Sequence, residues 1–427
     1  MIKFFLIFFL LFSFNSYSLS INETIDSTVK NNYKVKIGLE KLIESKELIS
    51  KSLGEKLPSI TGTISGTYST SESKATTGTT TPETFTDKYK LSITQNLYDA
   101  GFNDLEIKRS KLLYEDELIN FQISLQDLFV QAITGYFTVI NYEKTLEATK
   151  KNFESVTKAL EETKTRYELG SSSLFDLQSS ESAYAVAKAN FYAADQNFKI
   201  SKKSFKNIVS KDPINLEEIV KINSSIDYES SLNKLYKHNS NLKLLINKIE
   251  NNKILLLKEQ KTKKPNLDFT SSAEYSDAGR LEPGTESTSG SIALTLTVPI
   301  FQQNIDNSNI RKYHSQILQS ELEYENLKEE LEIEISNLYR DFNISLAEIE
   351  SNLSIIKATE TSIEIISQEY DIGTKTIMDL IQEESKLLTA KVDYLNSKKN
   401  YYISYFKIKS LEGTLLNDFE EFLPKFN

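Results

Sequence analysis

The sequence predicts a mainly α-helical chain that also carries membrane β-strands, arranged as two helix–strand–strand–helix repeats. Three observations predict this fold class. The two halves resemble each other at a constant offset, apolar residues recur every seven positions over long stretches, and four segments alternate apolar with small polar side chains. The first pattern indicates a duplicated unit. The second indicates long packed helices, and the third indicates β-strands with one lipid-facing and one wet side.

The N-terminus predicts a secretory signal peptide over residues 1–20. Lys3 supplies a positive charge and residues 4–12 supply an apolar core. Small residues that suit cleavage follow at Ser16, Ser18 and Ser20, and the expected cut is after Ser18 or Ser20. The apolar run is shorter than the ~20 residues that a spanning helix needs. Since no later stretch has that length either, we expect an exported chain without transmembrane helices.

Composition excludes several classes of protein. The net charge of -10 argues against a nucleic-acid-binding surface, which needs a basic stripe. The chain has no cysteine, so disulfides, thiolate metal sites and cysteine nucleophiles are excluded. His238 and His314 lie in helical patterns without a neighbouring ligand, and no phosphate-binding loop or nucleophile motif occurs. We therefore expect no enzyme activity, no metal and no cofactor.

The internal repeat defines the elements. Residues 166–210 align without gaps on 369–413, so that Gly170 corresponds to Gly373 and Asp176 to Asp379. The first repeat is predicted over 21–222, with helices 21–56, 101–169 and 174–210 and strands at about 58–70 and 87–98. The second is predicted over 223–413, with helices 228–262, 304–372 and 377–411 and strands at about 265–276 and 291–301.

The helices are predicted to form a long antiparallel wall. One stripe with seven-residue spacing comprises Leu177, Tyr184, Phe191, Phe198 and Phe205, and its counterpart comprises Leu380, Leu387, Tyr394, Tyr401 and Ile408. Such spacing keeps one seam against a partner helix. Each longest helix would reach ~100 Å at 1.5 Å per residue. The other predicted helices are near half that length, so two of them end to end would match one long helix.

The strands predict a barrel that one chain cannot close. The loops between paired strands, 69–87 and 276–291, are rich in Ser, Thr and Gly and are predicted to be solvated. A soluble amphipathic hairpin would show the same alternation, so this alternative stays open. In lipid, however, an unpaired sheet edge costs several kcal/mol per backbone group. Three copies would supply enough strands for a barrel with a lumen, so a homotrimer with twelve strands is predicted.

The chain resembles the TolC-like outer-membrane efflux protein family over essentially its whole mature length. The resemblance rests on the doubled element order, on "RYELGSSSLFDLQ" and "EYDIGTKTIMDLI", on "LTVPIFQQ" after the last strand, and on "IKSLEGTL" (408–415). It implies a trimeric twelve-stranded barrel in the outer membrane, continuous with a periplasmic tube of twelve helices. Residues 210–230 and 414–427 would then form an equatorial belt around the tube.

The resemblance also implies a function and partners. The trimer would be the passive exit duct of a tripartite efflux pump or a type I secretion system. It would open when a periplasmic adaptor protein and an inner-membrane transporter dock. The implied docking sites are the periplasmic turns at Gly170, Ser171, Gly373 and Thr374. Glycine suits a sharp reversal that needs a positive φ, and Thr374 or Thr376 is expected to cap the next helix.

The resemblance further implies a constriction of the bore near these turns. Asp176 and Tyr370 match the constriction pair of the family, and Lys375 stands where some members have arginine. Asp379 matches the outermost acidic ring, whereas Gln382 replaces the second aspartate of some members. Three Asp379 carboxylates would repel anions, bind multivalent cations and raise one another's pKa. A Lys375–Asp176 bridge would latch neighbouring helices. The structural alternative for both aspartates is an ordinary acid in the first turn of a helix.

Two other classes of protein compete with the duct. An exported trimeric coiled-coil adhesin or stalk carries its membrane strands at the C-terminus, whereas here the strands form two internal hairpins. A periplasmic coiled-coil chaperone would leave the four strands unexplained. The sequence therefore favours an outer-membrane location with a large periplasmic part.

Overall fold

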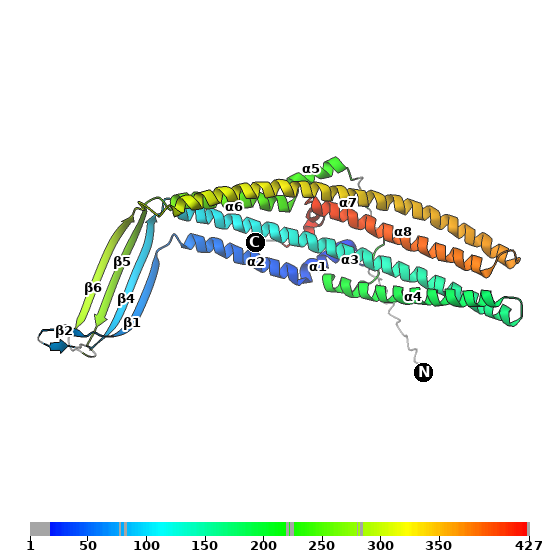
Figure 1. Cartoon of the computed structure of the whole chain (residues 1–427), viewed down its shortest axis with the longest axis horizontal. Helices are drawn as coiled ribbons and strands as arrows, with labels where there is room; N and C mark the ends of the chain where they lie inside the picture. The colour runs from blue at the N-terminus through cyan, green and yellow to red at the C-terminus, as the bar shows by residue number, and fades with distance from the viewer. Residues whose placement is uncertain are drawn as a thin grey trace, which may run out of the picture. The chain divides into compact units, whose positions relative to one another are not determined.

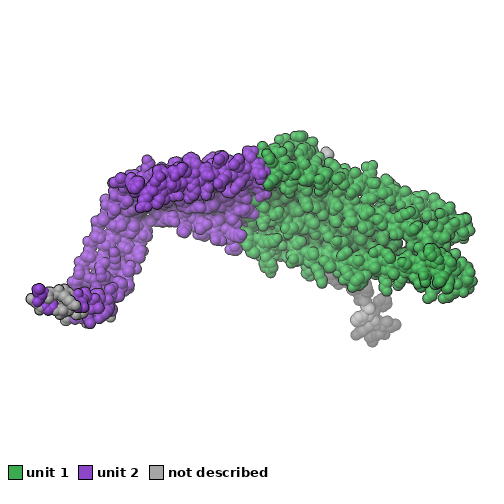
Figure 2. All heavy atoms as spheres, viewed as in Figure 1, with its two compact units in different colours: residues 1–38, 121–240, 328–427 green, residues 39–120, 241–327 purple. Residues whose placement is uncertain are grey.

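The computed structural model describes residues 18–76, 78–80, 83–218, 222, 226–279, 281 and 285–424. Residues 1–17 of the predicted signal peptide lie outside the described residues. The chain divides into two compact units (Figure 2). Unit 1 comprises residues 1–38, 121–240 and 328–427, and unit 2 comprises residues 39–120 and 241–327.

Long helices form two matching hairpins. The helices are α3 (Phe102–Glu168) and α4 (Leu174–Val209) in the first half, and α7 (Ile305–Asp371) and α8 (Ile377–Leu411) in the second. Both α3 and α7 contain 67 residues, and each is followed by a tight reversal into the shorter helix (Figure 1). The repeated helix–strand–strand–helix order is thus confirmed.

The predicted single helices 21–56 and 228–262 are wrong, because each is broken at an asparagine. The observed helices are α1 (Ile21–Asn31), α2 (Tyr33–Gly54), α5 (Tyr228–His238) and α6 (Ser240–Lys261). Asn32 and Asn239 leave the helical region with ψ of 133° and 125°. Their side-chain amides donate to the carbonyls of Ile208, at 2.8 Å, and Leu411, at 2.9 Å. These carbonyls lie in the last turns of α4 and α8, where no intrahelical donor remains.

Four strands form one antiparallel sheet in the order β1–β4–β5–β6. Their bounds are Ser59–Thr70, Glu83–Tyr98, Asn266–Asp277 and Glu286–Thr297. Two predicted strands are therefore misplaced. The strand predicted at 87–98 begins at Glu83, and the one predicted at 291–301 runs over residues 286–297, because the Ser- and Thr-rich loop ends pair in register with their neighbours. Pro299, which cannot donate to a ladder, follows the end of β6.

The loop predicted over residues 69–87 is also more ordered than expected. It contains a short hairpin of β2 (Ser73–Ala75) and β3 (Gly78–Thr80). Gly78 has φ of +142°, a value that glycine adopts more readily than other residues.

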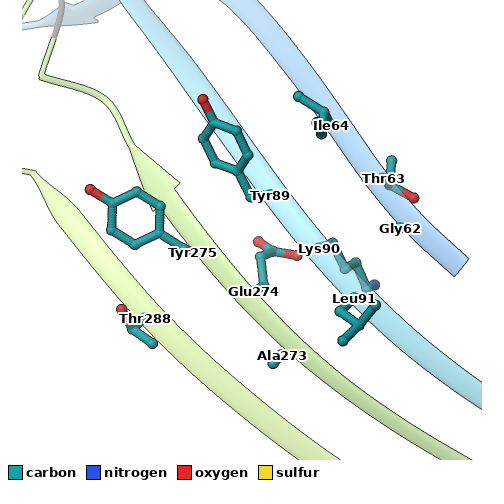
Figure 3. Close-up of a pocket in the computed structure, with 10 residues that line it drawn as sticks. All are labelled: Gly62, Thr63, Ile64, Tyr89, Lys90, Leu91, Ala273, Glu274, Tyr275 and Thr288. Atoms are coloured by element: carbon teal, nitrogen blue, oxygen red, sulfur yellow. The ribbon is translucent and has the colours of Figure 1, made fainter.

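The register of the sheet places the alternating apolar residues of its four strands on one face. Ile64, Tyr89 and Tyr275 lie side by side across β1, β4 and β5, and the two tyrosine rings are 6.2 Å apart (Figure 3). The opposite face is polar, and there Lys88 approaches Glu274 to 3.4 Å. One apolar and one polar face on strands of this length is the pattern of a membrane barrel wall.

Both strand-to-helix connections use the same backbone device. Ala100 and Gly101 have φ of 58° and 84°, and Gln303 and Asn304, their counterparts in the repeat, have φ of 53° and 60°. In the first connection the Asp99 carboxylate accepts from the backbone N–H groups of Gly101 and Asn103, both at 2.8 Å. Consecutive left-handed residues turn the chain sharply between strand and helix.

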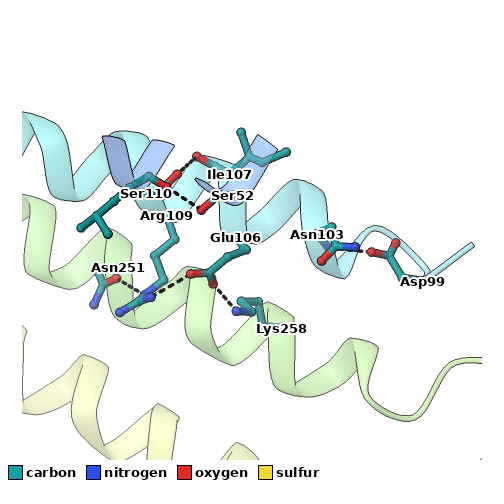
Figure 4. A network of polar contacts seen from close by, with 10 residues as sticks. Ser52, Asp99, Asn103, Glu106, Ile107, Arg109, Ser110, Asn251 and Lys258 are labelled. Carbon is teal, nitrogen blue, oxygen red and sulfur yellow. Dashed lines mark hydrogen bonds and ion pairs between the residues drawn. The ribbon is translucent and has the colours of Figure 1, made fainter. Parts of the chain in front are cut away.

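A polar network ties α3 to α6 within unit 2 (Figure 4). Glu106 accepts from Lys258 and, at 3.1 Å, from Arg109. Arg109 also donates to Asn251 at 3.2 Å. Burial acts to raise the pKa of Glu106, but the hydrogen bonds and charges of Lys258 and Arg109 outweigh it and lower the pKa. The network therefore holds an ionised carboxylate between the two helices.

A long run of buried side chains in unit 1 lies along α3. Its members are Phe121, Leu125, Leu128, Phe129, Ala132, Ile133, Tyr136, Phe137 and Val139. This stretch makes α3 apolar and long enough to resemble a membrane-crossing helix by composition, contrary to the sequence expectation, but half of the apolar window is buried in the protein. Packing in the core therefore explains its apolar character.

The seven-residue stripes and the C-terminal segment pack against the long helices. Phe191 stacks on Phe153 at 5.6 Å, and Tyr401 stacks on Phe342 at 4.7 Å. The 3-10 helix η1 (Leu415–Phe422) lies in the predicted belt segment and places Phe419 edge-on against Phe129 at 5.6 Å. Of the belt segments, residues 219–221, 223–225 and 425–427 lie outside the described residues.

Candidate gate at the hairpin tips

The reversals at Gly170 and Gly373 have the same hydrogen-bonded geometry. Their φ values are 72° and 80°, as the sequence predicts. In the first turn the N–H of Ser171 donates to the carbonyl of Arg166 at 2.8 Å, and in the second the N–H of Thr374 donates to Glu369 at 2.9 Å. This arrangement is a Schellman motif, which satisfies the last carbonyls of the incoming helix.

The two predicted gate aspartates lie in the first turns of the outgoing helices and form capping boxes with the residues that cap them. Ser173 caps α4 and Thr376 caps α8, and in each case the side-chain oxygen accepts from the N–H of the aspartate three residues later. The carboxylate of Asp176 accepts in return from Ser173 N at 3.2 Å, and that of Asp379 from Thr376 N at 2.9 Å. These reciprocal bonds are capping boxes. Within one chain, both aspartates therefore act as ordinary acids in the first turn of a helix, which was the alternative to a role in the gate.

The capping bonds keep both carboxylates ionised. Hydrogen bonds from the side chain and backbone of Ser173 lower the pKa of Asp176. Hydrogen bonds from the backbone and side chain of Thr376, with a smaller contribution from the charge of Lys375, lower the pKa of Asp379. Each carboxylate is thus a fixed negative charge at the start of a helix, where the helix dipole favours it.

Tyr370 is held by α3 of its own chain. Its hydroxyl donates to Glu162 at 2.9 Å, and Arg166 pairs with the same carboxylate oxygen at 2.7 Å. The Arg166 guanidinium also lies over the Tyr370 ring, 4.7 Å from its centroid. Burial and the hydrogen bond to Glu162 raise the pKa of Tyr370 to about 12. We call these three residues the Tyr370 cluster.

The Tyr370 cluster rests on an apolar core between the two hairpins. Its buried members are Val156, Ala159, Ala187, Tyr370, Ile377 and Ile381. Because these residues come from α3, α4, α7 and α8, the core joins all four helices near the turns. A movement of one hairpin against the other has to disturb this core and the Tyr370 cluster.

The predicted gate residues are only partly brought together in one chain. Asp176 is engaged by Ser172 and Ser173, and no ion pair among the described residues joins it to Lys375. Lys375 and Gln382 are exposed. Glu162 was missed by the sequence analysis because it carries no repeat or motif signal. Arg166 was quoted there as the first residue of "RYELGSSSLFDLQ" but was given no role at the gate. Within the described part of the chain, no cluster of acidic residues or histidines suits a metal ion.

Comparison with known protein families identifies the family to which the chain belongs. The model of the family described as "Outer membrane efflux protein" matches residues 55–209 and 259–414. The two matched segments correspond to the two repeats and together cover most of the chain. The chain belongs to the outer membrane efflux protein family.

Similar proteins agree with this membership. The outer membrane protein TolC of Escherichia coli is 23% identical over 341 residues, covering 76% of this chain and 69% of that protein. The outer membrane channel CmeC of Campylobacter jejuni superposes with a TM-score of 0.80 at 16% identity, covering 94% of this chain and 89% of that chain. VceC from Vibrio cholerae has a TM-score of 0.74 at 14% identity, covering 92% and 96%.

Membership in the outer membrane efflux protein family fixes the general role of the chain. The family consists of transport channels and not of enzymes, so the chain is an efflux channel of the outer membrane with a large periplasmic helical part. The adhesin or stalk interpretation is thereby set aside. The hairpin tips remain the candidate gate of this channel.

Proposed function

We propose that three copies of this chain form the exit duct of a tripartite efflux pump or a type I secretion system. The observation that carries the proposal is the open four-stranded sheet, whose edge strands β1 and β6 each pair on one side only within the described part of the chain. Because its apolar face suits lipid, unpaired edges there would cost several kcal/mol for each backbone group. Closure with further copies of the same sheet removes both edges.

The strand directions allow this closure. Four antiparallel strands place β1 and β6 in opposite directions, so β6 of one copy can continue antiparallel into β1 of the next. Three copies give twelve strands, which leaves room for a lumen, whereas two copies give eight strands, whose interior is filled by side chains. A trimer is therefore the assembly that both satisfies the edges and conducts.

The partner of the tips is a periplasmic adaptor protein, which links the duct to an inner-membrane transporter. Large apolar side chains are exposed beside the glycine turns, namely Leu169 at 78%, Phe175 at 76% and Ile372 at 75%. Gathered at the tip, these side chains would form an exposed apolar patch of the kind that another protein covers. Their position next to the turns supports docking at the tips.

The proposed duct is closed at rest by the tips and opened by docking. Asp379 of three copies would surround the axis as an acidic ring, and Lys375 of one copy would bridge Asp176 of a neighbour. The Tyr370 cluster would hold each α7–α8 hairpin against α3 of its own chain. Opening would then require the ionic latch and the Tyr370 cluster to yield together.

Purified protein in planar bilayers tests the duct. We expect a detergent-dependent trimer with a low resting conductance that increases in Lys375→Ala and Asp176→Ala. A water-soluble monomer that does not conduct would contradict the proposal. If neither substitution raises the resting conductance, the latch lies elsewhere.

Copurification tests the docking surface. A variant with Leu169→Ser, Phe175→Ser and Ile372→Ser should conduct normally but retain less of the host's adaptor after cross-linking. Ile214→Ser, an exposed apolar position away from the tips, is the matched control. Equal recovery of adaptor in both variants would remove the tips as its docking site.

A further inference from the structure

The sequence leaves two peptide bonds open for removal of the signal peptide. Cleavage after Ser18 would place Ser16 and Ser18 at the two small-residue positions before the cut, and cleavage after Ser20 would place Ser18 and Ser20 there. Both alternatives satisfy the sequence rule equally. The structure distinguishes them, because the two products differ by Leu19 and Ser20.

Leu19 is part of the folded unit 1. Its side chain is 4% exposed, its N–H donates to the Asn215 carbonyl at 3.0 Å, and its own carbonyl accepts from the N–H of Glu217 at 3.4 Å. These bonds form a parallel bridge between Leu19 and Leu216. Loss of Leu19 would therefore leave the Asn215 carbonyl and the Glu217 N–H without their partners.

The carbonyl of Leu19 also accepts a hydrogen bond from a fully buried hydroxyl. Tyr136 of α3 has no exposed surface, and its Oη lies 2.9 Å from the Leu19 carbonyl and 3.0 Å from the Glu217 carbonyl. The hydroxyl is thus clamped between the N-terminal segment and the segment that follows α4. A buried hydroxyl is costly when its acceptors are removed, so this core site also depends on Leu19.

Ser20 starts α1 as its N-cap. Its Oγ accepts from the N–H of Glu23 at 3.2 Å, and its own N–H donates to the Glu23 carboxylate at 2.9 Å. The Ser20 carbonyl also accepts from the hydroxyl of Thr24 at 2.9 Å. Cleavage after Ser20 would delete this capping box. It would also create a new ammonium at Ile21, in the first turn of α1, where a positive charge opposes the helix dipole.

Cleavage after Ser18 preserves all of these contacts. A new ammonium at Leu19 retains a donor for the Asn215 carbonyl, and the Glu23 carboxylate is bound at the next backbone nitrogen. Ser18 itself is exposed, so its removal leaves the core intact. Since processing precedes folding, the comparison concerns which product can complete this structure.

We propose that signal peptidase hydrolyses the Ser18–Leu19 bond, so that the mature chain begins at Leu19. Water adds across the C–N bond of this peptide, which leaves a carboxylate on Ser18 and an ammonium on Leu19. In the mature chain the Leu19 carbonyl then accepts from the Tyr136 hydroxyl, and Ser20 caps α1. The inference rests on export of the chain and not on the gate or on any partner.

Mass spectrometry of the N-terminal peptide of the protein purified from outer membranes tests the assignment. The expected peptide begins at Leu19. A peptide that begins at Ile21, or anywhere other than Leu19, would overturn it.

Two precursor variants test the bond independently of stability. Ser16→Tyr places a large residue three positions before the proposed bond and should abolish the cut after Ser18, so that the precursor accumulates or is cut after Ser20 instead. The matched Ser20→Tyr occupies the last position before the alternative bond and should still yield a chain that begins at Leu19. The reverse pattern, with Ser20→Tyr blocked and Ser16→Tyr processed, would contradict the proposal.

The structural reason has its own test. Mature chains beginning at Leu19 and at Ile21, each exported behind the same foreign signal peptide, should differ in thermal unfolding midpoint, with the shorter chain lower. Failure of the shorter chain to accumulate in the outer membrane counts as the same result. Equal accumulation with equal midpoints would refute the argument that the mature chain needs Leu19 and Ser20 to complete its fold.

Discussion

Asp379 combines a local role and a proposed shared role in one carboxylate. Within a chain it accepts from Thr376 and completes the capping box of α8, and in the trimer three copies would line the bore. The first role requires an acceptor oxygen, whereas the second requires negative charge. Because asparagine keeps an oxygen and loses the charge, a single substitution separates the two roles.

Asp379→Asn should weaken the block of reconstituted channels by divalent and trivalent cations, with little change in thermal stability. The measurement is single-channel conductance against cation concentration in planar bilayers. Glu147→Gln, which removes an exposed carboxylate from the middle of α3, is the control for a general change in surface charge. Unchanged block in Asp379→Asn would exclude this residue from the gate.

Tyr370→Phe should destabilise the protein by about 1 kcal/mol at neutral pH, the usual contribution of one intramolecular hydrogen bond. It removes the bond to Glu162 and keeps the ring beneath Arg166. The measurement is the unfolding free energy or midpoint in detergent. Tyr167→Phe is the matched control, since Tyr167 occupies the equivalent position of the first hairpin and is 39% exposed.

The hydrogen bond between Tyr370 and Glu162 also predicts that the stability of the protein depends on pH. The pKa of Tyr370 is raised to about 12 from the ordinary tyrosine value of 10.0, so the protonated hydroxyl is favoured in the folded state. Its contribution to stability is complete below about pH 10 and is lost as the pH rises toward 12. The stability difference between wild type and Tyr370→Phe should therefore shrink over this window. A constant difference would show that the hydroxyl titrates normally.

At the residue scale, sequence reasoning located the two aspartates and offered Thr376 as one of two candidate caps, but it did not identify the cap Ser173 or the contacts across the fold. Asp176 and Asp379 were recognisable because each follows a glycine turn at the same distance in both repeats. Glu162 was not, since its partner Tyr370 lies 208 residues away and no periodic pattern links them. Whether the two aspartates also meet Lys375 or one another depends on neighbouring chains, which a single sequence does not place.

At the scale of elements, the backbone of α2 at Gly38 lies directly against the Phe121 ring of α3. A Cβ built on Gly38 would lie 2.3 Å from the Phe121 ring, and Phe121 is buried. By contrast, a Cβ on Gly135 in α3 would meet the nearest atom of Phe205 at an ordinary 3.6 Å. Packing therefore favours glycine over alanine at position 38 but not at position 135.

Gly38→Ala should destabilise unit 1 by about 1–3 kcal/mol, the usual cost of overpacking. Gly135→Ala, the matched substitution, should be neutral or stabilise it by up to ~1 kcal/mol because alanine favours the helix. Thermal or denaturant unfolding of both variants measures the difference. If the two variants respond alike, the close approach at Gly38 is not a constraint.

The elements also show where a sequence pattern is ambiguous. Strand positions were predicted well where apolar residues alternate, but the strand ends were misplaced in Ser- and Thr-rich stretches that lack alternation. The helix breaks at Asn32 and Asn239 were missed because asparagine in a helical pattern indicates only a weak helix former. What decides the break is an acceptor carbonyl on a distant helix, and that contact is visible only in the fold.

For the whole molecule, the decisive step is the meeting of β6 in one copy with β1 in the next. Within a chain, Thr63, Lys90, Glu274 and Ser289 lie at one level across the sheet and on its polar face. Closure into a tilted barrel shifts the register between copies. Thr63 should therefore face a polar-face position of β6 displaced along the strand from Ser289.

Cysteine cross-linking tests this closure, and the chain is suited to it because it contains no cysteine of its own. Thr63→Cys is combined in turn with a cysteine at each polar-face position of β6, namely Ser287, Ser289, Ser291, Ala293 and Thr295. Under mild oxidation, one or two neighbouring pairs should give covalent trimers on non-reducing gels, because each copy then joins two neighbours. Single-cysteine variants should remain uncrosslinked. Covalent species that stop at the dimer, or no cross-link at any of the five positions, would mean that the sheet does not close with two further copies of itself.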